Sequence, residues 1–139
     1  MTSGARQRTA QGAYSCDRLI ITTGPWAAEL LGELELPMQV ERRVNGFFRP
    51  TRPEWWSVER GAPDCLLDVP EGSFYGMPAV GDVGVRIGLS AGEATTARTI
   101  RRTIDDAEIA SPRDELDRYL PRASGPEQRR ISCICTCTV

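Results

Sequence analysis

Two residue types are missing from this 139-residue sequence, which has no histidine and no lysine, so that all 17 of its basic residues are arginine. A Ser-His-Asp triad and a histidine zinc site need histidine, whereas a Walker phosphate loop and a Schiff-base enzyme need lysine. These four kinds of site are therefore excluded within this sequence. The 19 acidic residues leave a net charge of −2, and no basic tract is longer than two residues, so we expect no nucleic-acid partner.

Long apolar runs are also missing. No stretch approaches the ~20 apolar residues that a membrane span requires, and residues 1–13 have no apolar core that would serve as a signal sequence. The five cysteines are accordingly expected to be reduced thiols. We expect one domain's worth of cytoplasmic protein without a membrane partner.

The sequence does contain a row of cysteines near its end, in which Cys133, Cys135 and Cys137 alternate with Ile134 and Thr136. This alternation predicts a strand with three thiols on one face. Neighbouring thiols would lie about 6.5–7 Å apart, too far for an unstrained disulfide, and the row lacks the C-x-x-C spacing of a zinc knuckle. Two interpretations stay open, a small apolar strand face and a thiol that meets a cofactor.

The remaining pattern predicts an α+β chain. The polar residues 1–12 are expected to be a strand end or an unanchored tail. After them we expect a strand over 17–23, a turn at Gly24 and a helix that begins at Pro25. Further strands are predicted over 38–48, with a bulge or kink at Gly46, and over 65–69, 73–78 and 85–90 as an antiparallel meander. Ser111 and Pro112 predict the cap and first turn of a helix that ends near residue 120.

Five blocks, in this order, carry a resemblance to a known family: LIITTGPW at 19–26, RVNGFF at 43–48, FYGMP at 74–78, GVRIG at 84–88 and CICT at 133–136. The series resembles the monomeric sarcosine oxidase and N-methyltryptophan oxidase family, FAD-dependent amine oxidases of the D-amino acid oxidase superfamily. It covers the chain from about residue 14 to residue 138 and implies a largely antiparallel substrate-domain sheet flanked by helices.

The resemblance also implies a division of the chain. Residues 1–35 would supply a strand-turn-helix piece of an FAD domain, residues 36–128 the substrate-domain sheet, and residues 129–139 a strand that returns to the flavin. The sequence has no G-x-G-x-x-G at a strand-to-helix turn, since Gly81, Gly84 and Gly88 have the wrong spacing. We therefore expect an incomplete domain, a fragment of such an enzyme that does not bind FAD when isolated.

Carried over residue by residue, the resemblance implies a set of site residues. Cys133 would bond covalently to FAD, and Thr22, Thr23 and Gly24 would approach the flavin nucleotide. Arg86 would be the catalytic residue, in the place of a lysine near the flavin that assists reaction with O₂. The substrate pocket would be lined by Leu66, Tyr75, Ser90, which replaces a histidine, and Cys135, which replaces an aromatic residue. A secondary amine or N-methyl amino acid is the implied substrate class.

Three alternatives stay open at this stage. The chain would otherwise be a non-catalytic binding or assembly domain derived from such an enzyme, or a thiol-based domain for copper(I) or zinc. Arg86 would otherwise be a solvent-facing strand arginine paired with Asp82 or another acid. Exposed strand edges at 18–22 and 131–138 are expected to promote self-association.

Overall fold

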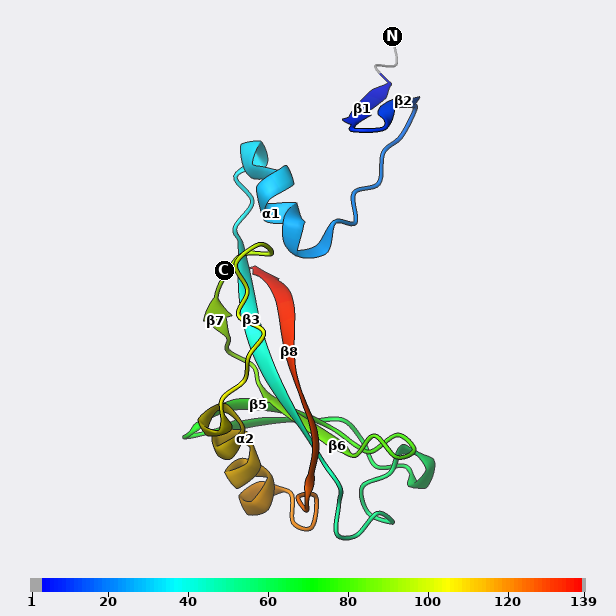
Figure 1. The fold of residues 1–139 in the computed structure, drawn as a ribbon. Helices are drawn as coiled ribbons and strands as arrows, with labels where there is room; N and C mark the ends of the chain where they lie inside the picture. Colours follow the sequence, from blue (N-terminus) through cyan, green and yellow to red (C-terminus); the bar gives the residue numbers. More distant parts are fainter. Residues whose placement is uncertain (1–3, 139) are drawn as a thin grey trace.

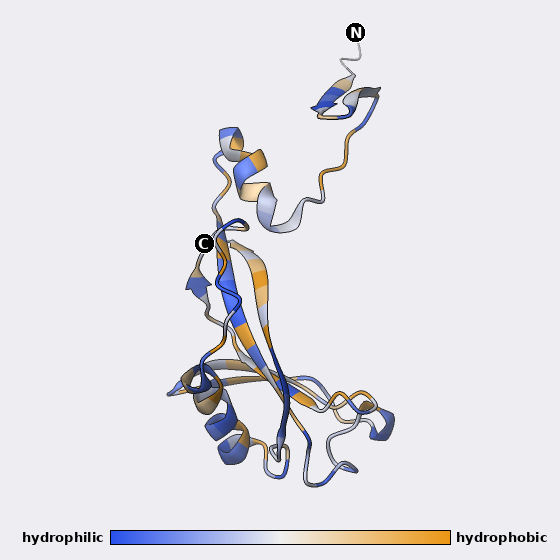
Figure 2. Cartoon of the chain, in the orientation of Figure 1, coloured by the Kyte–Doolittle hydropathy of each residue, from blue (hydrophilic) through white to orange (hydrophobic). Residues whose placement is uncertain are grey.

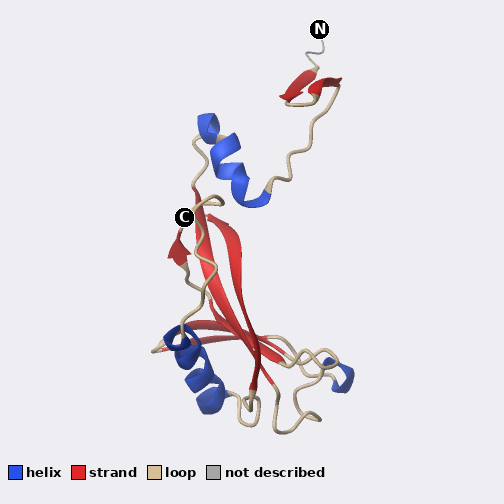
Figure 3. Ribbon diagram, viewed as in Figure 1, coloured by secondary structure: helices blue, strands red, loops and turns tan. Residues whose placement is uncertain are grey.

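The computed structural model describes residues 4–138 and contains one large antiparallel sheet with a small hairpin at a distance from it (Figure 1). The elements, in chain order, are β1 Ala5–Thr9, β2 Gly12–Cys16, the 3₁₀ turn η1 Gly24–Trp26, α1 Ala27–Leu30, η2 Gly32–Leu34, β3 Met38–Phe48, η3 Val58–Arg60, β4 Cys65–Val69, β5 Gly72–Met77, β6 Val85–Leu89, β7 Glu93–Ala94, α2 Asp106–Tyr119 and β8 Glu127–Thr138. Strands outnumber helices, as Figure 3 shows, and the expected α+β class is confirmed.

Strand β3 organises the large sheet. The strands β4, β5 and β6 form the predicted meander, and β6 pairs with the last four residues of β3. On its other side β3 pairs with the cysteine strand β8 over its whole length, from Met38 opposite Thr138 to Phe48 opposite Glu127. The predicted strands of the meander and the predicted cysteine strand are therefore present, and they share one sheet.

Alternation along these strands gives the sheet two faces. One, which we call the covered face, packs against α2 and forms the buried core, with Phe48, Phe74 and Ile87 from the strands and Ile109 and Leu116 from the helix. The opposite side, which we call the open face, carries the side chains that share the parity of Asn45 across the paired strands. Its members include Leu66, Tyr75, Met77, Asn45, Phe47, Arg86, Gly88, Cys133, Cys135 and Cys137.

A buried arginine fastens α2 to the covered face. Arg42 is 3% exposed, and its Nη1 lies 2.6 Å from Glu108 Oε1. Its Nε and Nη2 each donate to a backbone carbonyl, of Arg101 and Thr103 respectively, at 2.7 Å. Every side of this guanidinium is thus satisfied, as a buried charge requires.

The start of α2 differs from its prediction. The helix begins at Asp106, because Asp105 and Glu108 form a capping box in which Asp105 N donates to Glu108 Oε2 at 2.9 Å. Ser111 therefore lies inside the helix instead of capping it. Pro112 lies within the helix and not in its first turn, and its ring is buried. Since proline has no N–H, the Glu108 carbonyl lacks its usual helical donor.

Two further local predictions, for residues 17–23 and for Gly46, are wrong. The run 17–23 is irregular, because no described strand lies beside it to accept its hydrogen bonds. Figure 2 shows an orange, hydrophobic stretch within this run. Of the two expectations for the polar residues 1–12, the strand is present from residue 5 onward, in the β1–β2 hairpin. The irregularity in β3 pairing falls between Phe47 and Phe48, not at Gly46, whose added Cβ would lie 2.7 Å from the Phe48 ring.

Candidate functional site on the open face

Asn45 is the centre of a polar cluster on the open face. The side chain is fully buried, and its Oδ1 accepts hydrogen bonds from the Tyr75 hydroxyl at 2.6 Å and from Arg86 Nε at 2.9 Å. Its Nδ2 donates to Cys133 Sγ at 3.5 Å. One amide therefore joins three strands and holds together three of the residues that the sequence assigns to the site.

Arg86 keeps its charge uncompensated in this cluster. Its guanidinium lies over the Tyr75 ring, with 5.4 Å between the guanidinium carbon and the ring centroid, and Nη1 is 3.5 Å from Met77 Sδ. Among residues 4–138 no carboxylate lies within ion-pair distance of Arg86, so the alternative pairing with Asp82 is not formed. A half-exposed cation with only neutral partners can attract an anion from the open side.

The three cysteines of β8 lie on one face, as predicted, and are free thiols. Cys133 contacts Asn45, whereas Cys137 accepts a hydrogen bond from Arg43 Nη2 at 3.1 Å. Burial raises the pKa of the Cys135 thiol, against the opposing effect of Arg43. The neighbours of the three thiols therefore differ, and only Cys133 belongs to the Asn45 cluster.

The remaining substrate-side predictions fall on the same face but outside the cluster. Leu66 is opposite Tyr75 in the β4–β5 pair and is 79% exposed, so it offers an uncovered apolar surface. Ser90 follows β6, and its backbone N–H donates to the Ser73 carbonyl at 2.8 Å. The open face thus brings Leu66, Tyr75, Arg86 and Cys133 onto neighbouring strands.

The predicted nucleotide residues lie elsewhere. Gly24 opens η1, which contacts β8, and Thr22 and Thr23 precede it. Gly24 has φ of 54°, a left-handed conformation that favours glycine. The buried Thr23 Oγ1 has no hydrogen-bond partner among the described residues.

Two residues of the cluster were absent from the prediction. Asn45 precedes Gly46, and the pair reads as a turn or kink signal in a sequence, although here it lies within β3. Gly88 provides the space for the cluster, because a Cβ there would lie 2.6 Å from Asn45 Oδ1 and 2.7 Å from the Tyr75 hydroxyl oxygen. The sequence did contain a signal for Gly88. It is two residues from Arg86 in the same strand, and residues at that spacing lie on the same face.

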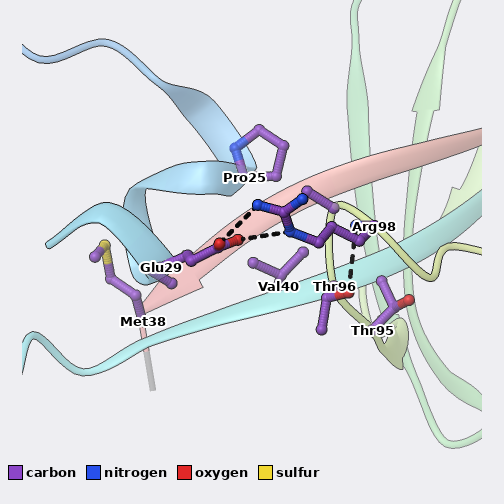
Figure 4. A pocket seen from close by; sticks show the side chains of 9 residues that line it. Pro25, Glu29, Met38, Val40, Thr95, Thr96 and Arg98 are labelled. Carbon is purple, nitrogen blue, oxygen red and sulfur yellow. Dashed lines mark hydrogen bonds and ion pairs between the residues drawn. The ribbon is translucent and has the colours of Figure 1, made fainter. Parts of the chain in front are cut away.

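A separate hollow of about 530 Å³ lies between η1, α1, the start of β3 and the loop at 95–98 (Figure 4). Met38 and Val40 contribute apolar lining, and Glu29 and Arg98, which form an ion pair at 2.8 Å, also line the hollow. Since Met38 and Val40 alternate with the open-face residues of β3, this hollow belongs to the other face of the sheet.

Two other properties bear on the alternatives. The described residues hold no group of three or more His, Cys, Asp or Glu side chains placed to bind a metal ion, so the thiol-metal interpretation gains no support. None of the helices within residues 4–138 has the length and apolar character needed to cross a membrane.

The open face of the antiparallel sheet thus carries Arg86 without an ion-pair partner among the described residues, together with the free thiol of Cys133. The family model described as FAD dependent oxidoreductase, DAO, matches residues 2–138. The chain therefore belongs to the DAO family of FAD-dependent oxidoreductases.

Curated relatives agree with this assignment. The chain is 34% identical over 136 residues to a monomeric sarcosine oxidase of Bacillus sp. strain B-0618, and 30% identical over 135 residues to one of Streptomyces avermitilis. Each match covers 94% of this chain and 35% of the relative. A mouse peroxisomal sarcosine oxidase is 36% identical over 75 residues, or 52% of this chain. The chain thus spans about a third of the length of the monomeric relatives.

Solved structures share the fold. NikD, an unusual amino acid oxidase essential for nikkomycin biosynthesis, superposes with a TM-score of 0.65 at 18% identity, over 97% of this chain and 36% of NikD. A fructosyl peptide oxidase from E. terrenum gives a TM-score of 0.62 at 18% identity, over 96% of this chain and 35% of its own.

Proposed function

We propose that this chain forms the substrate-side part of an FAD-dependent oxidase that oxidises the C–N bond of a secondary amine or N-methyl amino acid. The observation that carries the proposal is the Asn45 cluster, which gathers Tyr75, Arg86 and Cys133 on the open face of the sheet. The curated relatives named sarcosine oxidase support the substrate class.

The residues present fit FAD. We propose that the open face lies against the flavin, with Cys133 as the covalent thiol, and that residues 1–35 contribute Thr22, Thr23 and Gly24 to the nucleotide end. The unpartnered Thr23 Oγ1 and the free, half-buried Cys133 thiol support this placement. Bound FAD would accept a hydride from the substrate and pass the electrons to O₂.

The roles of the protein's own side chains follow from their contacts. Arg86 holds a fixed positive charge, which would stabilise negative charge that develops on O₂. Tyr75 and Leu66 offer an aromatic ring and an apolar surface for the substrate's methyl-bearing end, with Ser90 and Cys135 as polar boundaries. The Asn45 amide fixes the Tyr75 hydroxyl as a donor to itself, so the phenol oxygen faces the site as an acceptor.

A chimera tests this proposal directly. This chain would replace the matching third of the Bacillus monomeric sarcosine oxidase, which supplies the remaining two thirds of the length. We expect a yellow protein whose flavin is bleached anaerobically by sarcosine or another N-methyl amino acid. A folded chimera that binds flavin but is bleached by no secondary amine would contradict the proposed substrate class, and one that binds no flavin would contradict the placement of the open face.

The chain by itself is proposed to lack this activity. It contains no G-x-G-x-x-G, so we expect the isolated chain to retain no FAD after gel filtration. The outer edge of β8 pairs with no described strand, although Arg102 Nη1 lies 3.3 Å from the Ser132 carbonyl oxygen. We expect concentration-dependent self-association through this edge, measurable by sedimentation velocity, and a monomer at all concentrations would contradict that expectation.

A further inference from the structure

The position of Asn45 is unusual for a strand residue. It is fully buried although it lies on the open face, and its two amide atoms make three hydrogen bonds to three different strands. Buried amides that contact only side chains usually serve to orient them, because each lost bond leaves a buried polar atom unpaired.

We propose that Asn45 is the positioning residue of this site, which orients Arg86 as a free cation and the Cys133 sulfur as a nucleophile through one amide. The consequence for flavin chemistry rests on the proposed function, whereas the coupling of the two side chains is a property of this chain alone.

The neutrality of the amide is the first part of the argument. Arg86 Nε requires an acceptor, and a carboxylate at this place would neutralise the guanidinium in an ion pair, as Glu108 does for Arg42. The Asn45 Oδ1 accepts the hydrogen bond without adding a negative charge. Arg86 is therefore held in a fixed orientation while its positive charge stays available.

The other end of the amide supplies the second part. Nδ2–H donates to Cys133 Sγ at 3.5 Å, and Oδ1 accepts from both the Tyr75 hydroxyl and Arg86 Nε, so a flipped amide would lose all three bonds. The Gly88 position leaves just enough space for this arrangement, since a Cβ there would collide with both Asn45 and Tyr75. The amide thus holds the Cys133 sulfur, the nucleophilic atom of that side chain, at one place on the open face.

The test measures the alkylation rate of each cysteine in the 139-residue chain, with iodoacetamide as the probe and peptide mass spectrometry as the readout. Asn45→Asp keeps the shape of the side chain but adds a negative charge beside the sulfur. We expect the Cys133 rate to fall about tenfold, while the Cys65 rate stays unchanged.

Gln39→Glu is the matched control, because Gln39 lies on the same strand and face but pairs with Cys137. Gln39 is four residues along β3 from Arg43, which lies opposite Cys133. At about 3.3 Å per residue, the separation along the strand is larger than the screening length of roughly 10 Å at 0.1 M salt. The Cys133 rate should therefore change less than about twofold in this variant.

Arg86→Gln is the second variant and leaves Asn45 intact. Because Arg86 and the Cys133 sulfur bind the same amide, loss of the guanidinium should lower the alkylation rate of Cys133 about threefold. Unchanged Cys133 rates in both Asn45→Asp and Arg86→Gln, with native circular dichroism spectra, would overturn the proposal, and if Asn45→Asp does not fold, Arg86→Gln decides alone. Since no flavin takes part, such a result would leave the proposed oxidase function to the chimera.

Discussion

The two faces of the sheet use the same residue type in opposite ways. On the covered face, Arg42 forms an ion pair with Glu108 of α2 and hydrogen bonds to two backbone carbonyls, so its charge is compensated and stabilises the packing of α2. On the open face, Arg86 meets an amide, an aromatic ring and a thioether, all of them neutral. A compensated strand arginine stabilises the fold, whereas an uncompensated one remains available for an anion.

The largest effect on stability should come from removing a core side chain of the covered face. Phe48 is fully buried and packs in the core, so Phe48→Ala should lower the free energy of unfolding by about 3–5 kcal/mol. Leu66, 79% exposed on the open face, is the contrasting position, and Leu66→Ala should change it by less than about 0.5 kcal/mol. Urea unfolding of both variants measures the difference, and equal losses would erase the distinction between the faces.

The next effect concerns the ion pair under α2. Hydrogen bonds from Arg42 and Arg101 lower the pKa of Glu108 from 4.5 to about 2. The folded chain thus binds this proton more weakly than the unfolded chain, and the stabilisation is complete above pH 4.5 and is lost as the pH falls through about 2. Glu108→Gln should cost about 2 kcal/mol near neutral pH.

Urea unfolding between pH 2 and pH 6 checks this linkage. The wild-type chain should lose stability on acidification across the interval between the two pKa values, and Glu108→Gln should flatten that part of the curve. Arg113→Gln, at another position on α2, is the control and should leave the slope as it is. A wild-type slope that survives in Glu108→Gln would assign the acid sensitivity to other carboxylates.

The comparison also shows which features a sequence can reveal. The strands β3, β5, β6 and β8 follow from alternation, which is local. The run 17–23 has the same β-branched composition but forms no strand, because pairing depends on a neighbour that composition does not supply. The start of α2 was available in the sequence as the Asp105–Glu108 capping box, yet Ser111 and Pro112 gave a competing signal.

The site was predictable to a similar extent. Strand parity places Leu66, Tyr75, Arg86 and Cys133 on one face once the register is known. Asn45, the common hydrogen-bond partner of Tyr75, Arg86 and Cys133, was not predictable, because the register between β3, β6 and β8 is set by long-range pairing. An Asn-Gly pair also indicates a turn more often than a strand interior.

A smaller effect, on rate instead of stability, is expected at Arg86 in the chimera with the Bacillus relative. Arg86→Met should slow flavin reoxidation by O₂ about tenfold, because the fixed positive charge is lost. Arg86→Lys should speed reoxidation several-fold, since the compact ammonium approaches O₂ more closely than the planar guanidinium. Reduction by substrate should be almost unaffected in both, and stopped-flow rates that do not change would remove Arg86 from the site.

The most direct measurement asks which thiol of β8 faces the flavin. The chimera would be precipitated with acid in three forms, with the chain unchanged, with Cys133→Ser and with Cys135→Ser. Because only Cys133 contacts the Asn45 cluster, the yellow colour should stay in the pellet for the unchanged chain and for Cys135→Ser, and should move to the supernatant for Cys133→Ser. Colour retained in Cys133→Ser and released in Cys135→Ser would contradict the account, since the flavin would then lie one residue pair further along the strand.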